Sequence, residues 1–302
     1  NLTRVVALRR VIRRQRPDIL IGMMTAANVL VTLAALDSRV PVIVCERTYP
    51  PQLPVSALWR QLRRLTYPLA SRVAMLTSEG LDWLRREIPR ARGVVMPNPV
   101  PYPLPVNVPE LLPAAVVADD RKVLLTVGRM SEEKGFSGLI EAFASLAGHL
   151  PQWDLVILGD GPLRVELTQQ VMAKGLAGRV LMPGRAGNVG AWYERADLYV
   201  LSSRVEGFPN TLGEAMAYGC AAVSFDCDTG PRDLIRHEVD GLLVPPGDVG
   251  ALAQSLGRLM QDDALRAQMA ARALEVRERY SMQRVLGLWD ELFADVCQKK
   301  RA

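Results

Sequence analysis

The chain has 302 residues, of which 49% are hydrophobic and 23% are charged. This length suits two domains, and the composition excludes an intrinsically disordered protein. The 4 cysteines and 2 histidines are scattered, without the spacing of zinc ligands. That pattern argues against a disulfide framework or a structural zinc site and favours a reducing compartment.

The net charge of +5 is unevenly distributed. Residues 1–106 contain 16 arginines, no lysine and 6 acidic residues, a net charge of +10, which leaves −5 for the remainder. Two parts of opposite charge indicate two domains that face different partners. Many of these arginines fall in clusters that alternate with apolar residues, as on amphipathic helices. The clusters are Arg9, Arg10, Arg13, Arg14 and Arg16, then Arg60, Arg63 and Arg64, then Arg85 and Arg86.

Two interpretations of the arginine clusters stay open. They form either a solvated helix face or a surface that contacts anionic lipid headgroups. Nucleic acid is not expected as a partner, because no aromatic residues alternate with these arginines.

The first part of the chain begins inside a predicted helix that ends at Arg16-Pro17-Asp18. Residues 19–36 carry no charge, a length at the threshold for a membrane span. A buried strand over 19–22 followed by a helix over 26–36 explains this segment better. Because a parallel-sheet domain normally begins with a strand, we expect a strand–loop–helix portion upstream of Asn1.

Strand-like runs alternate with helical segments along the whole chain. The predicted strands are 19–23, 40–45, 73–77 and 94–96, then 122–127, 154–158, 180–183, 198–201, 221–225 and 242–244. This alternation predicts an α/β fold with doubly wound parallel sheets. The proline-rich segment 96–105 coincides with the change of charge, so we predict domains over 1–106 and 107–302. We expect the terminal helices, within 252–302, to pack back on the first domain.

Two glycine-containing loops follow predicted strands of the second domain. Gly128-Arg129-Met-Ser-Glu-Glu-Lys134-Gly135 joins a strand to a helix, where glycines and the helix start favour an anion. Arg129 and Lys134 add two charges suited to a diphosphate leaving group, although a plain polar connection would also explain them. Gly159-Asp-Gly161-Pro162 is accounted for almost completely by a tight turn, and it adds a position at the carboxyl edge of the sheet, where ligands of this fold class bind.

A pair of glutamates bounds the run Glu206-Gly-Phe-Pro-Asn-Thr211-Leu-Gly-Glu214. Glu206 follows the strand over 198–201, and a loop carboxylate beside glycine and proline suits the hydroxyl groups of a ligand. Glu214 lies about one turn into the next helix. The spacing from Thr211 to Glu214 is also that of a capping box, so Glu214 has an alternative role in the helix itself.

These motifs, with Asp240-Gly-Leu-Leu-Val-x-Pro-x-Asp248, resemble in order and spacing the retaining glycosyltransferases of family 4. The resemblance covers residues 122–248 and the Pro-Asn-Pro linker upstream. It implies a GT-B fold of two Rossmann-like domains, the first incomplete here, with the sugar donor bound mainly by the second. It also implies front-face attack assisted by the leaving diphosphate, so that no protein nucleophile is needed.

The resemblance assigns roles to residues of this chain. Arg129 and Lys134 would hold the diphosphate without a metal ion or other cofactor, and Glu206 would contact the sugar hydroxyls as a third catalytic residue. Glu214 would bind the ribose hydroxyls. Further substrate contacts would come from Gly128, Gly184, Arg185, Gly207, Phe208, Pro209, Asn210, Thr211 and Gly230, with Gly184 and Arg185 near the nucleobase.

Glu46 is a departure from the family pattern, in which many members carry a histidine after the corresponding strand. It resembles the bacterial branch that uses amino-sugar donors and lipid-linked acceptors, so we predict Glu46 as a substrate-binding residue. The implied protein transfers a hexosyl or N-acetylhexosaminyl group from a UDP-sugar to a glycan or polyprenyl-linked acceptor in polysaccharide biosynthesis. It would work in the cytoplasm, at the inner face of the plasma membrane.

Three alternatives stay open. One is a sugar-nucleotide epimerase of the same fold. Another is a phosphorylase, which would need a lysine-bound pyridoxal cofactor for which no signal is found. The third, from a different class, is a nucleotide-sugar-binding module without catalysis.

Overall fold

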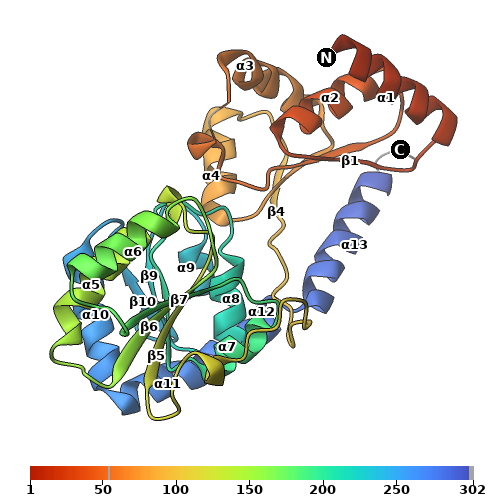
Figure 1. Ribbon diagram of the computed structural model, residues 1–302. Helices are drawn as coiled ribbons and strands as arrows, with labels where there is room; N and C mark the ends of the chain where they lie inside the picture. The colour runs from red at the N-terminus through yellow and green to blue at the C-terminus, as the bar shows by residue number, and fades with distance from the viewer. Residues whose placement is uncertain (54, 299–302) are drawn as a thin grey trace. The chain divides into compact units, whose positions relative to one another are not determined.

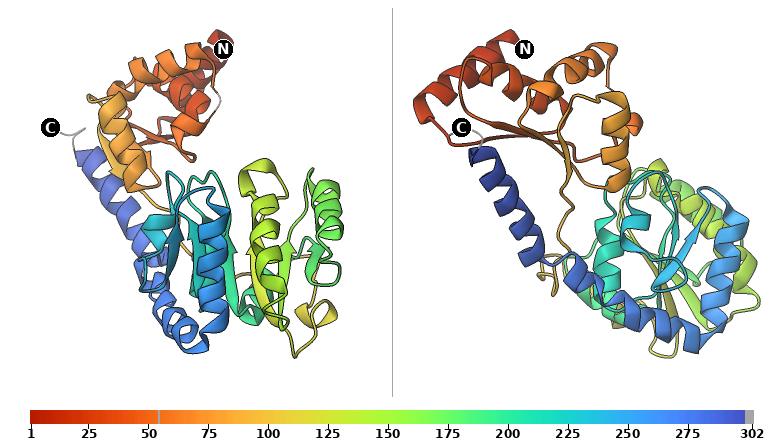
Figure 2. Two further views of the ribbon diagram at one scale, coloured as in Figure 1. Left: turned by 90° about the vertical axis from the view of Figure 1, so that its left-hand side faces the viewer. Right: turned by 180° about the vertical axis from the view of Figure 1, so that it is seen from behind.

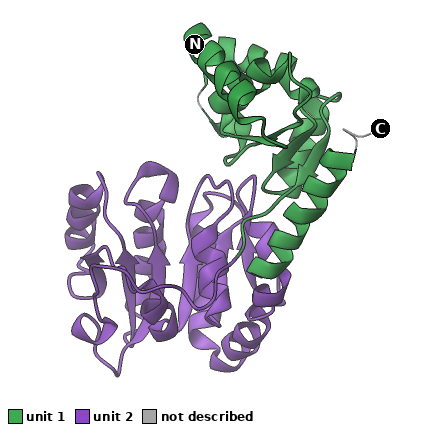
Figure 3. Ribbon diagram, turned by 90° about the vertical axis from the view of Figure 1, so that its right-hand side faces the viewer, with its two compact units in different colours: residues 1–99, 282–302 green, residues 100–281 purple. Residues whose placement is uncertain are grey.

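The computed structural model describes residues 1–53 and 55–298, which form two compact units (Figures 1 and 3). Unit 1 contains Asn1–Pro99 and the C-terminal segment that begins at Met282, and unit 2 contains Val100–Ser281. Residues 299–302 of the predicted helical stretch lie outside the described residues.

The boundary falls after Pro99 rather than after Val106, because the proline-rich segment is hydrogen-bonded along unit 2. The amide of Val100 donates to the carbonyl of Tyr280 at 2.8 Å. Further along, the amide of Leu104 donates to the hydroxyl of Tyr218 at 2.8 Å. An extended, proline-rich segment can thus still belong to a domain when its remaining amides find partners there.

Unit 1 is built around a four-stranded parallel sheet of order β1-β2-β3-β4. Its strands are β1 (Leu20–Met23), β2 (Val42–Cys45), β3 (Arg72–Met75) and β4 (Gly93–Val95). Its helices are α1 (Leu2–Gln15), α2 (Thr25–Ala35), η1 (Pro50–Gln52), α3 (Ala57–Thr66), η2 (Tyr67–Leu69), α4 (Ser78–Glu87) and α13 (Met282–Gln298). The charge-free segment is therefore a strand and a helix, as predicted. Among the described residues, no helix is both long and apolar enough to cross a membrane.

Helix α13, from the end of the chain, belongs to the core of unit 1 (Figures 2 and 3). Leu292 and Val296 pack with Ile43 and Cys45 of β2. The opposite face of the sheet is covered by α1, α2 and α4, in a separate apolar cluster. Each central strand is thus buried on both faces, which explains its continuous apolar sequence.

Unit 2 has a six-stranded parallel sheet of order β10-β9-β8-β5-β6-β7. Its strands are β5 (Lys122–Val127), β6 (Trp153–Leu158), β7 (Val180–Gly184), β8 (Leu198–Leu201), β9 (Ala222–Phe225) and β10 (Gly241–Val244). Its helices are η3 (Pro113–Ala115), η4 (Glu132–Lys134), α5 (Phe136–Ala147), α6 (Arg164–Ala173), α7 (Val189–Arg195), α8 (Asn210–Ala217), α9 (Pro231–Leu234), α10 (Val249–Gln261), α11 (Asp263–Ala273) and α12 (Val276–Arg279). The strand order reverses between β5 and β8, and α/β sheets bind ligands at the carboxyl side of such a point.

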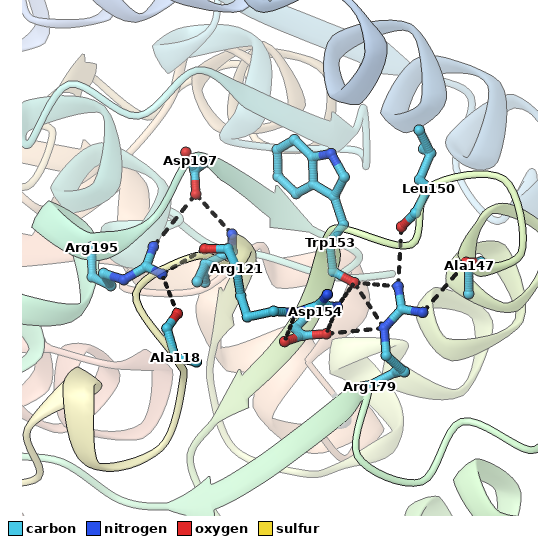
Figure 4. Close-up of polar contacts among 10 residues, drawn as sticks. Ala118, Arg121, Ala147, Leu150, Trp153, Asp154, Arg179, Arg195 and Asp197 are labelled. Atoms are coloured by element: carbon cyan, nitrogen blue, oxygen red, sulfur yellow. Dashed lines mark hydrogen bonds and ion pairs between the residues drawn. The ribbon is translucent and has the colours of Figure 1, made fainter.

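The amino edge of the unit 2 sheet is held by a charged cluster (Figure 4). Asp154, whose side chain is 6% exposed, accepts hydrogen bonds from Arg121 at 2.5 and 2.8 Å and from Arg179 at 3.0 Å. Arg195 donates to the carbonyl oxygen of Arg121 and forms an ion pair with Asp197 at 3.6 Å. The cluster joins the segments that lead into β5, β6, β7 and β8.

We expect Asp154→Asn to lower the free energy of unfolding by about 2–3 kcal/mol, because it leaves two partly buried guanidinium groups without their anion. The matched control is Glu238→Gln, which removes a carboxylate from an exposed two-bond pair with Arg258 and should have a much smaller effect. Urea unfolding followed by tryptophan fluorescence measures both. Equal losses of stability would contradict a structural role for the cluster.

Candidate functional site

A pocket of about 640 Å³ opens at the carboxyl edge of the unit 2 sheet. It is lined by the loops after three adjacent strands. Gly128 and Arg129 follow β5, the segment 159–161 follows β6, and Arg185 and Ala186 follow β7. The structure therefore brings together Gly128, Arg129 and Arg185, which were predicted from separate motifs.

Close backbone approach explains the glycines of this pocket. Gly159 has φ +141°, and a Cβ placed there would lie 1.9 Å from the carbonyl oxygen of Gly128. A Cβ on Gly161 would lie 2.4 Å from the carbonyl oxygen of Met130. Only glycine lets the loops after β5 and β6 approach so closely. The Gly-Asp-Gly-Pro turn is thus part of the pocket wall, at the carboxyl edge of the sheet where the sequence placed it.

Lys134 and Glu206 meet across the reversal of the sheet. Lys134 Nζ lies 2.6 Å from Glu206 Oε1, with side chains 21% and 10% exposed. Lys134 comes from the loop after β5 and Glu206 from the loop after β8, the two strands between which the order reverses. The sequence predicted both residues but not that they form an ion pair with each other.

Side-chain hydroxyl groups join these two loops to each other and to the loop after β9. Ser202 Oγ donates to the carbonyl of Lys134 at 2.8 Å, and Thr229 Oγ1, from the loop after β9, donates to the carbonyl of Glu206 at 2.5 Å. Gly135 has φ +64°, and a Cβ there would lie 2.2 Å from the carbonyl oxygen of Ser202. Sequence reasoning missed Ser202 and Thr229, whose only signal is a small hydroxyl residue shortly after a buried strand.

Glu214 does not cap its helix. Helix α8 has no side-chain hydrogen bond at its start, and Thr211 Oγ1 instead accepts from the hydroxyl of Tyr199 at 2.9 Å. Glu214 Oε2 accepts from the hydroxyl of Tyr193 at 2.9 Å. The capping-box interpretation is therefore wrong, because Glu214 and Thr211 accept hydrogen bonds from tyrosine hydroxyls instead of from the first amides of the helix. Sequence reasoning also missed Tyr193.

Tyr199 of β8 lies beneath α8, where its hydroxyl donates to Thr211 Oγ1. Its side chain is fully buried, and burial raises its pKa. The hydrogen bond to Thr211 opposes this rise in pKa, and the negative charges of Glu214 and Glu206 add to it.

The segment between the glutamates offers free backbone amides. Within the described part of the chain, the amides of Gly207 and Phe208 donate no hydrogen bond, whereas the amide of Asn210 donates to the carbonyl of Phe208 at 2.9 Å. The ring of Phe208 is buried against Tyr280, with centroids 5.7 Å apart. Two of the amides predicted to face a ligand are therefore available.

Gly184 and Gly230 have backbone conformations with positive φ that the loops at the carboxyl edge require. Gly184, with φ +103°, accepts from the amide of Gly159 at 2.8 Å. Gly230, with φ +99°, lies against Pro209, whose Cδ would be 2.5 Å from a Cβ at that position. Both positive φ values favour glycine, and Gly230 brings the loop after β9 onto the loop after β8.

Glu46 has an internal position in unit 1. Its side chain is 1% exposed and accepts hydrogen bonds from Thr25 Oγ1 at 2.9 Å and from the hydroxyl of Tyr67. Burial raises the pKa of this carboxyl group. In place of the substrate-facing side chain predicted from the sequence, the structure has a carboxyl group that ties the end of β2 to α2 and η2.

No group of three or more histidine, cysteine, aspartate or glutamate side chains that could hold a metal ion occurs in residues 1–53 and 55–298.

The position of Glu214 predicts a gain in stability when its charge is removed. Burial raises its pKa above the ordinary value of 4.5, so the folded state holds this proton more tightly than the unfolded chain. The free energy of unfolding therefore falls as the pH rises from about 4.5 through the folded pKa. Glu214→Gln keeps an acceptor for Tyr193 and should make this fall smaller, with stability at pH 7.5 equal to or above that of the native sequence.

Urea unfolding at pH 5 and pH 7.5 tests this expectation. An equal loss of stability at both pH values in the Glu214→Gln variant would restore a structural role for the carboxylate.

Two family comparisons match the two parts of the chain. Residues 108–276, more than half of the chain, match the family described as Glycosyl transferases group 1. Residues 1–99 match the description Glycosyl transferase 4-like domain.

Two curated relatives and one solved structure illustrate the similarity. An exopolysaccharide phosphotransferase of Streptomyces coelicolor is 33% identical over 239 residues, which are 78% of this chain and 24% of that protein. An alpha-1,4-N-acetyl-D-galactosaminyltransferase of Campylobacter jejuni is 28% identical over 291 residues, 96% of this chain and 78% of that protein. The chain thus spans about a quarter of the first relative and about three quarters of the second.

The solved structure is HepE of Anabaena in complex with UDP. It has a TM-score of 0.83 and 21% identity, and the match covers 96% of this chain and 82% of that one. This likeness, with the two parallel sheets, confirms the predicted GT-B fold. Together with the match over residues 108–276, it leads to one conclusion: this chain belongs to the glycosyl transferases group 1 family.

Proposed function

We propose that this chain is a glycosyltransferase that moves a hexosyl or N-acetylhexosaminyl group from a UDP-sugar to a glycan or lipid-linked acceptor, with retention of configuration. The observation that carries the proposal is the Lys134–Glu206 ion pair at the reversal of the unit 2 sheet. Lys134 lies next to the 640 Å³ pocket, because its Cδ would be 3.5 Å from a Cβ on Gly128, a lining residue. The Anabaena structure contains UDP, and the name of the Campylobacter relative includes a diphospho-undecaprenol acceptor, both of which support this choice.

The pocket suits the nucleotide part of the donor. Its walls combine glycine backbone with the side chains of Arg129 and Arg185, which are both exposed. The diphosphate would lie against Arg129 and Lys134, where two positive charges oppose the negative charge that develops on the leaving phosphate. Glu214, held by Tyr193, would accept from the ribose hydroxyls.

Glu206 would have a different partner in the absence and in the presence of the sugar donor. Without donor, its carboxylate neutralises Lys134 at 2.6 Å and keeps the ammonium group in place. With donor, it would accept hydrogen bonds from the sugar hydroxyls, while Lys134 turns toward the diphosphate. The free amides of Gly207 and Phe208 would add uncharged donors beside the same group.

The acceptor would be part of cell-surface polysaccharide or glycan biosynthesis. The arginine-rich helix α1 presents Arg10, Arg13 and Arg14 to solvent, which suits a membrane surface that carries anionic lipids. We therefore place the reaction in the cytoplasm, at the inner face of the plasma membrane.

Removal of either member of the ion pair should abolish most of the turnover. Lys134→Ala and Glu206→Gln are each expected to lower the rate of UDP release by at least about tenfold, because each removes a charge beside the reacting group. The matched control is the Lys174–Glu141 pair, which has the same chemistry and a distance of 2.7 Å on the surface of unit 2. Lys174→Ala should leave the rate within about twofold.

UDP release is measured with a panel of UDP-sugars and a prenyl-diphosphate acceptor. Native turnover in the Lys134→Ala and Glu206→Gln variants would refute these roles. Binding of UDP without release from any UDP-sugar would favour a binding module without catalysis.

We also propose that no metal ion takes part, since Arg129 and Lys134 supply the positive charge at the diphosphate. Turnover should be unchanged after treatment with EDTA and gel filtration. A loss of activity that Mg²⁺ or Mn²⁺ restores would overturn this part of the proposal.

A further inference from the structure

The segment 107–111 of unit 2 contacts one wall of the 640 Å³ pocket from outside. We call it the strap; it follows the proline-rich run and leads into η3. Its partner is the segment 184–189, which runs from the end of β7 to the start of α7. This segment, the base wall, supplies Arg185, Ala186 and Val189 to the lining of the pocket. The strap and the base wall both belong to unit 2.

Backbone hydrogen bonds join the strap to the base wall. The amide of Asn107 donates to the carbonyl of Gly187 at 3.0 Å, and the amide of Gly187 donates to the carbonyl of Pro109 at 2.6 Å. A Cβ on Gly187 would lie 2.0 Å from the carbonyl oxygen of Asn107, so only glycine lets the two segments come this close. The strap therefore lies directly on the backbone of the base wall.

Asn188 makes the side-chain part of this contact. Its Oδ1 accepts from the amide of Leu111 at 2.9 Å, and its Nδ2 donates to the carbonyl of Leu111 at 3.1 Å. Trp192 of α7 adds a hydrogen bond from Nε1 to the same carbonyl at 2.9 Å. Asn188 is 4% exposed and Trp192 is fully buried, so these hydrogen bonds are shielded from water.

The use of the Asn188 side chain differs from what its position in the helix favours. Asn188 is the N-cap residue of α7, where asparagine commonly accepts from the first amides of the helix. Here the side chain makes no cap hydrogen bond. It pairs instead with both backbone groups of Leu111, 77 residues earlier in the chain. Asn188 thus joins the start of α7 to the strap.

The place of the base wall in the sheet explains why it needs this contact. Strand β7 is the last strand of the unit 2 sheet, so its loop has a neighbouring strand loop on one side, the loop after β6. That neighbour contributes the hydrogen bond from the amide of Gly159 to the carbonyl of Gly184. Gly184 and Gly187 leave the base wall with little stiffness of its own. The strap supplies the further hydrogen bonds that fix it.

We propose that Asn188 is a positioning residue, which holds the base wall against the strap in the arrangement that selects the nucleobase of the donor. This inference rests on the proposed function, which it deepens by identifying what fixes the base-binding side of the pocket. The side chain of Asn188 is engaged by Leu111, so it would act through Ala186 and Val189, which line the pocket. Their apolar side chains and the glycine backbone suit the flat face of a base.

Two variants weaken the strap contact and leave the pocket lining unchanged. Asn188→Ala removes both side-chain hydrogen bonds to Leu111, and Trp192→Phe removes the third. The matched control is Trp153→Phe, because Trp153 is also fully buried and its Nε1 donates to the carbonyl of Met260 at 3.2 Å. Trp153 begins β6, at the amino edge of the sheet. The two tryptophan variants thus make the same chemical change, and one of them touches the strap.

Hydrogen–deuterium exchange tests the contact without any ligand. Peptides that cover residues 184–192 should exchange at least about fivefold faster in Asn188→Ala and Trp192→Phe than in the native chain, because fewer hydrogen bonds oppose local opening. Trp153→Phe should leave these exchange rates within about twofold of the native rates. Native exchange rates in both strap variants would overturn the inference.

Isothermal titration calorimetry then measures base selection with UDP, CDP, GDP and ADP, and inorganic pyrophosphate probes the diphosphate site alone. The strap variants should raise the Kd of the preferred nucleotide by about tenfold, with a change of less than about twofold for pyrophosphate. With the matching nucleotide-sugar, KM should rise in the same proportion, while kcat stays within about twofold. A merely structural role would instead lower the affinity for all the probes together.

The outcomes separate this inference from the proposed function. A preference for UDP that both strap variants retain would count against this inference alone. A preference for another base that the strap variants abolish would support this inference and count against the UDP donor of the proposed function. Equal effects of the Trp153→Phe control would overturn the positioning role. Trp192→Phe keeps the test valid should Asn188→Ala fail to fold.

Discussion

The parallel direction of every strand is the constraint on which the rest of unit 2 depends. Because β5 to β10 all run the same way, the loops that follow them meet at one edge, and the reversal of order between β5 and β8 separates two of those loops. Lys134 and Glu206 come from these two loops and meet at 2.6 Å. The candidate site therefore depends on the strand order. If β5 and β8 were not neighbours in the sheet, the ammonium group of Lys134 and the carboxylate of Glu206 would not meet.

Charged side chains at the amino and carboxyl edges of this sheet differ in how fully they are paired. At the amino edge, Asp154 and its arginines satisfy one another, and the charges hold the segments that lead into the strands (Figure 4). At the carboxyl edge, Arg129 and Arg185 are exposed, and the Lys134–Glu206 pair lies beside an open pocket. Charge that is fully paired stabilises a fold, whereas charge that faces a pocket can serve a ligand.

Three glutamates that looked alike in the sequence have three different environments. Glu206 is paired with a lysine, Glu214 accepts from a buried tyrosine, and Glu46 lies inside unit 1. Burial raises the pKa of the last two, so each weakens the fold at neutral pH as a charged group. For Glu214 this cost is consistent with a role in binding, since the helix itself gains no cap from it.

The sequence by itself determined the two α/β units, every strand to within a few residues, and the loops that carry Arg129, Lys134 and Glu206. These features depend on local periodicity and on turn residues, which the chain shows without its partners. Only the tertiary structure decided which side chains meet. The boundary at Pro99, the contact of Tyr193 with Glu214, the burial of Glu46 and the contact of Asn188 with Leu111 all depend on residues far apart in the chain. Such contacts follow from packing and burial, which no local pattern encodes.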